Sequence, residues 1–133
     1  LGGALHSAAR AAIEAGALDD AASHLAEAGT LAARGEPTFG RQLNQRQFAI
    51  RTAILKARLA ARSGERTAAR GLATDVIAEF EPIMPRSGLE NRTYFMEAYL
   101  LAGEHAKAQA LADQFVALGY RHADFEQLRA QLQ

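Results

Sequence analysis

The same turn signal occurs three times along the chain. A glycine is followed five positions later by an alanine in the stretches GALDDAASHLAEA, GERTAARGLATDV and GEHAKAQALADQF. The residues concerned are Gly16, Gly64 and Gly103, with Ala21, Ala69 and Ala108. Glycine permits the tight turn between two antiparallel helices, and alanine lets the second helix approach the first closely. The repeated signal therefore predicts three helical hairpins.

Proline and the remaining glycines mark the limits of these hairpins. They predict hairpins over about 2–35, 38–81 and 89–119 and a short capping helix over about 124–132. The stretch EPIMPRSGLE, residues 81–90, is expected to be a connection, because it holds two prolines and a glycine in ten residues. The whole chain, residues 1–133, is then a single all-α domain.

Composition removes several classes of function. There is no cysteine, so no disulfide framework and no cysteine-based zinc or redox site is possible. The 15 basic and 15 acidic residues cancel, which disfavours a nucleic-acid or membrane surface. The four histidines lack metal-site spacing and no catalytic motif is present. We expect no enzyme activity, metal, cofactor, nucleic acid or membrane contact.

The first residue is Leu and not Met. We therefore expect the chain to be a fragment or processed product of a larger protein. The cytoplasm is its default location. Its high alanine and arginine content is typical of bacterial proteins.

Residues 41–62, RQLNQRQFAIRTAILKARLAAR, hold six bases and no acid. At about 100° per residue, two apolar faces form on this helix, and Arg51, Arg58 and Arg62 share the strip between them. A helix apolar on two flanks packs on its hairpin partner and on a neighbouring hairpin. The three arginines are then expected to face a groove. The alternative is a solvated row, or arginines paired with acids such as Glu14, Glu97 or Asp75.

The hairpins resemble the tetratricopeptide repeat family over most of residues 2–118. The resemblance rests on the turn glycine, the alanine five residues later and a small or apolar residue seven beyond it, here Ala28, Val76 and Phe115. The family's Trp, Leu-Gly and Tyr positions are mostly alanine in the first two units, and the glycines lie 48 and 39 residues apart instead of about 34. The resemblance implies hairpins stacked as a right-handed superhelix with a C-terminal capping helix. A simple antiparallel bundle stays open as an alternative.

The resemblance also implies a function. Members of this family commonly hold peptides in a concave groove, where basic side chains clamp a carboxylate. Aligned on the turn glycine, Arg10 and Arg58 occupy a like position, and the third unit has Glu97 there. The predicted groove residues are Arg10, Arg51, Ile54, Arg58, Arg62 and Glu97.

We therefore expect a non-enzymatic protein–protein interaction or scaffold module that binds a peptide segment of acidic character. Two other functions stay open: a ligand-sensing domain of a multidomain regulator, and a module for forming homodimers. The aromatic group Tyr94, Phe95, Met96, Tyr99 and Leu100 is expected to be core.

Overall fold

The computed structural model describes residues 2–34, 42–120 and 123–132, and these residues form an all-α structure. Its helices, in chain order, are α1 (Gly2–Ala15), α2 (Leu18–Arg34), α3 (Gln42–Arg62), α4 (Arg66–Phe80), the 3₁₀ helix η2 (Glu81–Arg86), α5 (Leu89–Ala102), α6 (His105–Ala117) and α7 (Ala123–Ala130). The predicted all-α class is confirmed. The predicted start of the second hairpin, at about residue 38, lies outside the described residues.

The three glycine turns are built alike. Gly16, Gly64 and Gly103 all have a positive φ of 80–83°, a conformation that costs glycine nothing. In the first turn, the N–H of Gly16 donates to the carbonyl of Ile13 (3.1 Å) and the N–H of Ala17 donates to that of Ala12 (2.8 Å). The turns at Gly64 and Gly103 repeat both bonds with the same spacing. This is the Schellman arrangement, which satisfies the last carbonyls of a helix.

The alanine five residues after each glycine lies in the hairpin contact. Ala21 and Ala108 are fully buried and Ala69 is 3 % exposed. Within each hairpin, α1 packs on α2, α3 on α4 and α5 on α6. The burial of all three alanines agrees with a close approach of the paired helices, which a larger side chain would push apart.

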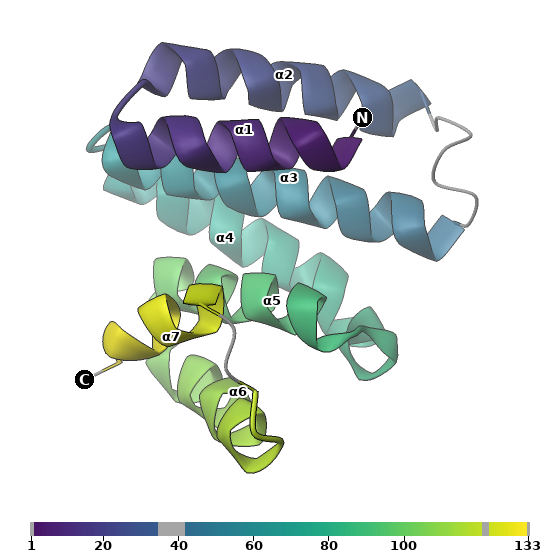
Figure 1. Cartoon of the computed structure of the whole chain (residues 1–133), viewed down its shortest axis with the longest axis vertical. Coiled ribbons are helices and arrows are strands. Elements are labelled where there is room, and N and C mark those ends of the chain that lie inside the picture. Colours follow the sequence, from purple (N-terminus) through teal and green to yellow (C-terminus); the bar gives the residue numbers. More distant parts are fainter. Residues whose placement is uncertain (1, 35–41, 121–122, 133) are drawn as a thin grey trace.

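The hairpins stack in chain order (Figure 1). The first helices of successive hairpins, α1 with α3 and α3 with α5, also contact each other. No comparable contact joins the second helices in the described part of the chain. The stack is therefore tighter on the side of the first helices, and that side carries the site.

The connection between the second and third hairpins is itself helical. Residues 81–86 form η2, with Pro82 in its first turn, where the missing N–H of proline has no helical partner to lose. Ile83 is fully buried against the core. The segment thus connects two hairpins, as expected, but it also contributes to the core.

Helix α5 lies at the centre of the core. Residues 93–99 are all buried, because α3, α4, α6 and α7 all pack on this helix. Phe80 stacks on Phe95 with centroids 4.1 Å apart and meets Tyr99 edge-on at 5.3 Å. The expected core role of Tyr94, Phe95, Met96 and Tyr99 is confirmed, whereas Leu100 is only partly buried.

The final helix covers the last hairpin. Phe125 of α7 is fully buried, and its ring meets those of Phe115 and Tyr120 at 4.9 and 5.7 Å. Helix α7 also contacts α5. A terminal helix of this kind shields the apolar face that a further hairpin would otherwise cover.

Candidate functional site

A pocket of about 260 Å³ opens on the side of the first helices. Residues from α1, α3, α5 and α7 line it, together with Tyr120 and Gln131. Its charged lining residues are Arg10, Glu14, Arg58, Arg62 and Glu97. They come from equivalent places in the repeat and form two levels, which we call the inner and outer levels.

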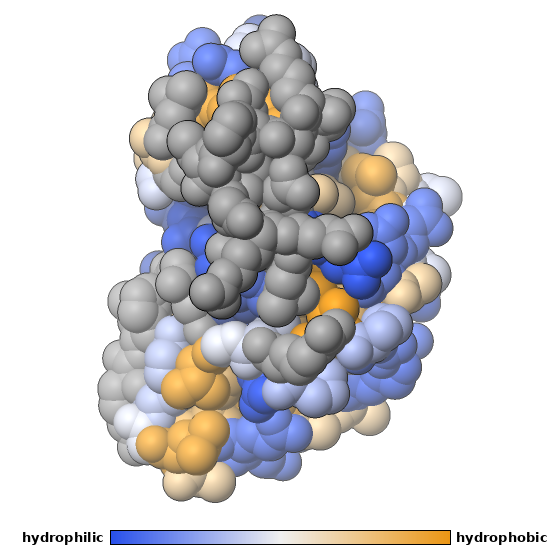
Figure 2. Space-filling view, turned by 90° about the vertical axis from the view of Figure 1, so that its right-hand side faces the viewer, coloured by the Kyte–Doolittle hydropathy of each residue, from blue (hydrophilic) through white to orange (hydrophobic). Residues whose placement is uncertain are grey.

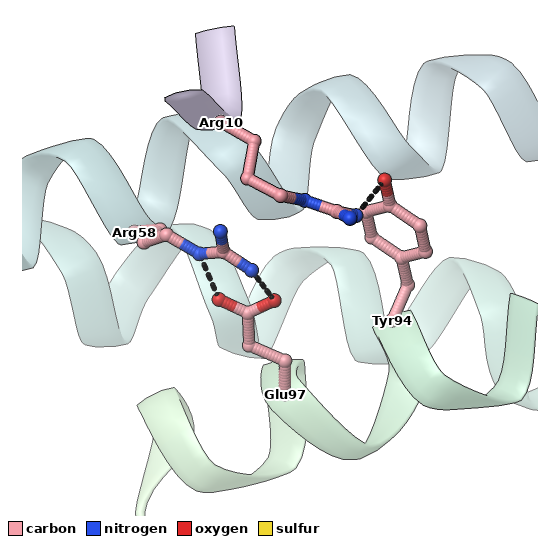
Figure 3. Close-up of polar contacts among 4 residues, drawn as sticks. All are labelled: Arg10, Arg58, Tyr94 and Glu97. Carbon is pink, nitrogen blue, oxygen red and sulfur yellow. Dashed lines mark hydrogen bonds and ion pairs between the residues drawn. The ribbon is translucent and has the colours of Figure 1, made fainter. Parts of the chain in front are cut away.

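The inner level consists of the residues six positions before each turn glycine, namely Arg10, Arg58 and Glu97 (Figure 3). The Nε and one terminal nitrogen of Arg58 donate to the two carboxylate oxygens of Glu97. The side chains of this pair are only 19 % and 8 % exposed. Such a two-pronged bond between charged groups is among the strongest polar contacts in proteins. It ties α3 to α5 at the floor of the pocket.

Glu97 also governs the ionisation of Arg58. Burial would lower the pKa of Arg58, but the hydrogen bonds and the negative charge of Glu97, together with electrostatic interactions with Tyr94 and Glu14, raise that pKa above its ordinary value. The guanidinium is therefore charged at every relevant pH, and its positive charge is balanced within the pair.

Tyr94 of α5 is bonded to the inner level. A terminal nitrogen of Arg10 donates to its hydroxyl, which joins α1 to α5 across the molecule (Figure 3). The guanidinium carbons of Arg10 and Arg51 each lie 5.1 Å from the centre of its ring, close enough for attraction between a cation and a ring face. Burial raises the pKa of Tyr94 despite these positive charges, so the hydroxyl stays protonated and can act as both donor and acceptor.

The seam between α3 and the third hairpin holds two more polar contacts. Gln47 donates to the hydroxyl of Ser87 (3.1 Å) and Arg51 donates to the side-chain oxygen of Asn91 (2.7 Å). Together with the Arg58–Glu97 pair, these contacts lie along the seam. The two partners of each contact are 40, 40 and 39 residues apart in the sequence. Two of the three arginines in the predicted row thus bind α5.

The outer level consists of the residues two positions before each turn glycine, namely Glu14, Arg62 and Leu101. Glu14 and Arg62 are exposed. Neither makes a hydrogen bond or ion pair with another residue that the structure describes. These two side chains are the charged groups at the pocket that are available to a ligand.

The pocket includes four of the six predicted groove residues: Arg10, Arg58, Arg62 and Glu97. Arg51 does not line it, because it lies nearer the start of α3 and binds Asn91. The prediction for Ile54 is wrong. Ile54 is fully buried, because it lies on the apolar flank of α3 that packs into the core with Ile50 and Ala57.

Some lining residues were not predicted as part of the groove. Glu14 could have been found, since it occupies the same place before Gly16 as Arg62 does before Gly64. Gln127, Leu128 and Gln131 come from the end of the chain. No local pattern signals them, because only the packing of α7 brings them to the first helices.

Among the described residues, no group of three or more histidine and acidic side chains is placed to hold a metal ion. None of the helices in the part of the chain that the structure describes is long and apolar enough to cross a membrane.

A second surface feature is apolar. The large apolar side chains that are exposed in the described ranges are Leu72, Val116 and Leu118, at 36, 39 and 64 %. Figure 2 shows apolar residues at the lower end of the molecule, in the region where α6 lies. None of these three residues lines the pocket.

Comparison with models of protein families, with curated proteins and with solved structures found no match to the chain.

Proposed function

We propose that the protein is a non-enzymatic module for protein–protein interaction, with a repeat architecture similar to tetratricopeptide repeats, that binds a short acidic peptide segment in the pocket between its first helices. The observation that carries the proposal is Arg62, an exposed guanidinium at a preformed pocket that has no partner among the described residues. An arginine can hold a carboxylate through two parallel hydrogen bonds, and partial enclosure strengthens them.

The inner level supports the site without being its main ligand contact. The carboxylate of Glu97 already accepts hydrogen bonds from the Nε and one terminal nitrogen of Arg58. An incoming carboxylate would have to displace Glu97 to bind these two donors. The hydroxyl of Tyr94 already accepts from Arg10. These contacts hold α1, α3 and α5 at fixed spacing, and such preorganisation reduces the cost of binding.

Self-association is less well supported. A stable dimer buries roughly 800 Å² on each partner, whereas the described residues expose only three large apolar side chains, Leu72, Val116 and Leu118. A regulatory role, in which a ligand alters the packing between hairpins, would use the same pocket.

The test measures binding of a fluorescein-labelled hexapeptide pool by fluorescence anisotropy. The pool has glutamate fixed at its two central positions. We expect Arg62→Ala to weaken binding about tenfold or more, since a hydrogen-bonded charge pair contributes about 1.5–3 kcal/mol. The matched control is Arg66→Ala, which removes an exposed arginine at the start of α4, outside the pocket.

Binding that is unchanged in Arg62→Ala, or lost equally in Arg66→Ala, would contradict the proposal. Circular dichroism on each variant checks that the helices persist. Changing Arg51 and Arg58 together with Arg62 would be a poorer test, because it would also remove contacts between α3 and α5.

A further inference from the structure

We propose that the peptide segment carries a basic group as well as a carboxylate, with the carboxylate at Arg62 and the base at Glu14. This inference rests on the proposed function and names the chemistry of its ligand. It concerns the outer level of the pocket, where two opposite charges from neighbouring helices are both available.

The geometry of the repeat places these two charges together. Glu14 and Arg62 each lie two residues before a turn glycine, on α1 and α3, which contact each other. Both line the pocket. Even so, their charged atoms are not within the 4 Å of an ion pair, since neither residue has such a contact in the described part of the chain. A gap between two opposite charges is suited to a ligand that bridges them.

A purely acidic ligand fits this arrangement less well. Its carboxylates would gain from Arg62 but would be repelled by Glu14, because both side chains line the same small pocket. Arg58 attracts Glu14 electrostatically, but Arg58 is bonded to Glu97 and Arg10 is bonded to Tyr94. Neither arginine forms an ion pair with Glu14. Three arginines against two glutamates leave the pocket with a small positive excess, so the ligand needs at least as many acidic groups as basic ones.

The uncharged residues of the lining determine how large and how polar the part of the ligand between its two charged groups can be. Leu100, Leu101, Tyr120 and Leu128 are buried or partly buried apolar residues of the lining. The volume of about 260 Å³ falls just below the usual range of ligand pockets, roughly 300–1,000 Å³. The pocket therefore accepts one or two side chains of a segment, and the third repeat, with Leu101 at the outer level, offers an apolar contact.

The test compares three labelled hexapeptide pools: an acidic pool with two fixed glutamates, a basic pool with two fixed lysines, and a mixed pool with one of each in both orders. We expect the wild type to bind the mixed pool several-fold more tightly than the acidic pool, and the basic pool weakly. Glu14→Gln should abolish the preference for the mixed pool while leaving binding of the acidic pool equal or stronger. Glu79→Gln, an exposed change on α4 outside the pocket, should keep the wild-type order.

A charge exchange adds a second measurement. The double variant Glu14→Arg/Arg62→Glu should bind the mixed pool better than either single variant, because it restores one charge of each sign at the pocket.

The outcomes separate this inference from the proposed function. If the acidic pool binds the wild type as tightly as the mixed pool and Glu14→Gln changes neither, the dipolar ligand is ruled out while the acidic-peptide function stands. If no pool binds the wild type, both are overturned.

Discussion

His6 shows how a single side chain joins the first two hairpins. It is 4 % exposed, its ring stacks on Phe48 with centroids 4.2 Å apart, and its Nε2 lies 2.7 Å from the hydroxyl of Thr52. That hydroxyl donates to the carbonyl of Phe48 (3.0 Å), so it can only accept from His6. The proton of the neutral ring is therefore on Nε2, and the buried Nδ1 has no hydrogen-bond partner in the described ranges.

Protonation of His6 is unfavourable in the folded state. Burial, followed by the charges of Arg51 and Arg10, lowers its pKa from 6.5 to about 4. Between these two values the unfolded chain binds a proton that the folded protein does not, so the free energy of unfolding decreases as the pH falls. The contribution is fully present above pH 6.5 and is lost by about pH 4, on the order of 3 kcal/mol in total.

We therefore predict that urea unfolding followed between pH 7 and pH 4 shows a smaller loss of stability in His6→Gln than in the wild type. His105→Gln, which changes an exposed histidine on α6, should follow the wild-type curve. Parallel curves for His6→Gln and the wild type would show that His6 is not the residue responsible.

The arginines of α3 show how side-chain burial decides between binding and structure. Arg58 and Glu97 are mostly buried, and a charge in that position must find a partner within the protein. The partner was visible in the sequence, because Arg58 and Glu97 each lie six residues before a turn glycine. Equivalent residues of successive first helices face each other, so opposite charges at such positions predict a pair. The further contact of Arg10 with Tyr94 depends on side-chain reach and has no such signal.

At the scale of the element, the glycine turns determine where each helix ends. The same two hydrogen bonds recur at Gly119, whose φ is 73°, so α6 ends in the way that α1, α3 and α5 end. This is why the ends of these four helices could be predicted from glycine alone. Periodicity does not mark helix α5, because contacts with four other helices leave it without one polar face.

Two glycines permit a matched test of this role. Gly64 has a φ of 83° with no atom within 4 Å of an added Cβ, whereas Gly71 is exposed inside α4 and is equally open. We predict that Gly64→Ala lowers the free energy of unfolding by about 1–2 kcal/mol, because alanine is strained in the left-handed region. Gly71→Ala should raise it by about 0.5–1 kcal/mol.

Urea titrations monitored by circular dichroism compare the two variants. Equal effects from both substitutions would show that the turn conformation at Gly64 is not important for stability.

At the scale of the whole molecule, the repeat explains both the fold and the pocket. Successive first helices contact each other, so residues at one repeat position gather on one side, from Arg10, Arg58 and Glu97 at the inner level to Glu14, Arg62 and Leu101 at the outer level. The sequence could predict the hairpins and most of the charged residues. It could not predict the wall from α7 or the burial of Ile54, because both depend on how helices distant in sequence pack.

The central proposal is that a peptide binds between the first helices. The most direct measurement is a ¹H–¹⁵N NMR titration of the wild-type protein with the acidic hexapeptide pool. We expect the largest shift changes at the backbone amides around Glu14, Arg62 and Leu101, with further changes near Gln127 and little change in α4. Changes concentrated on α2 and α4 or around Leu118, or no changes at saturating peptide, would contradict a binding site at this pocket.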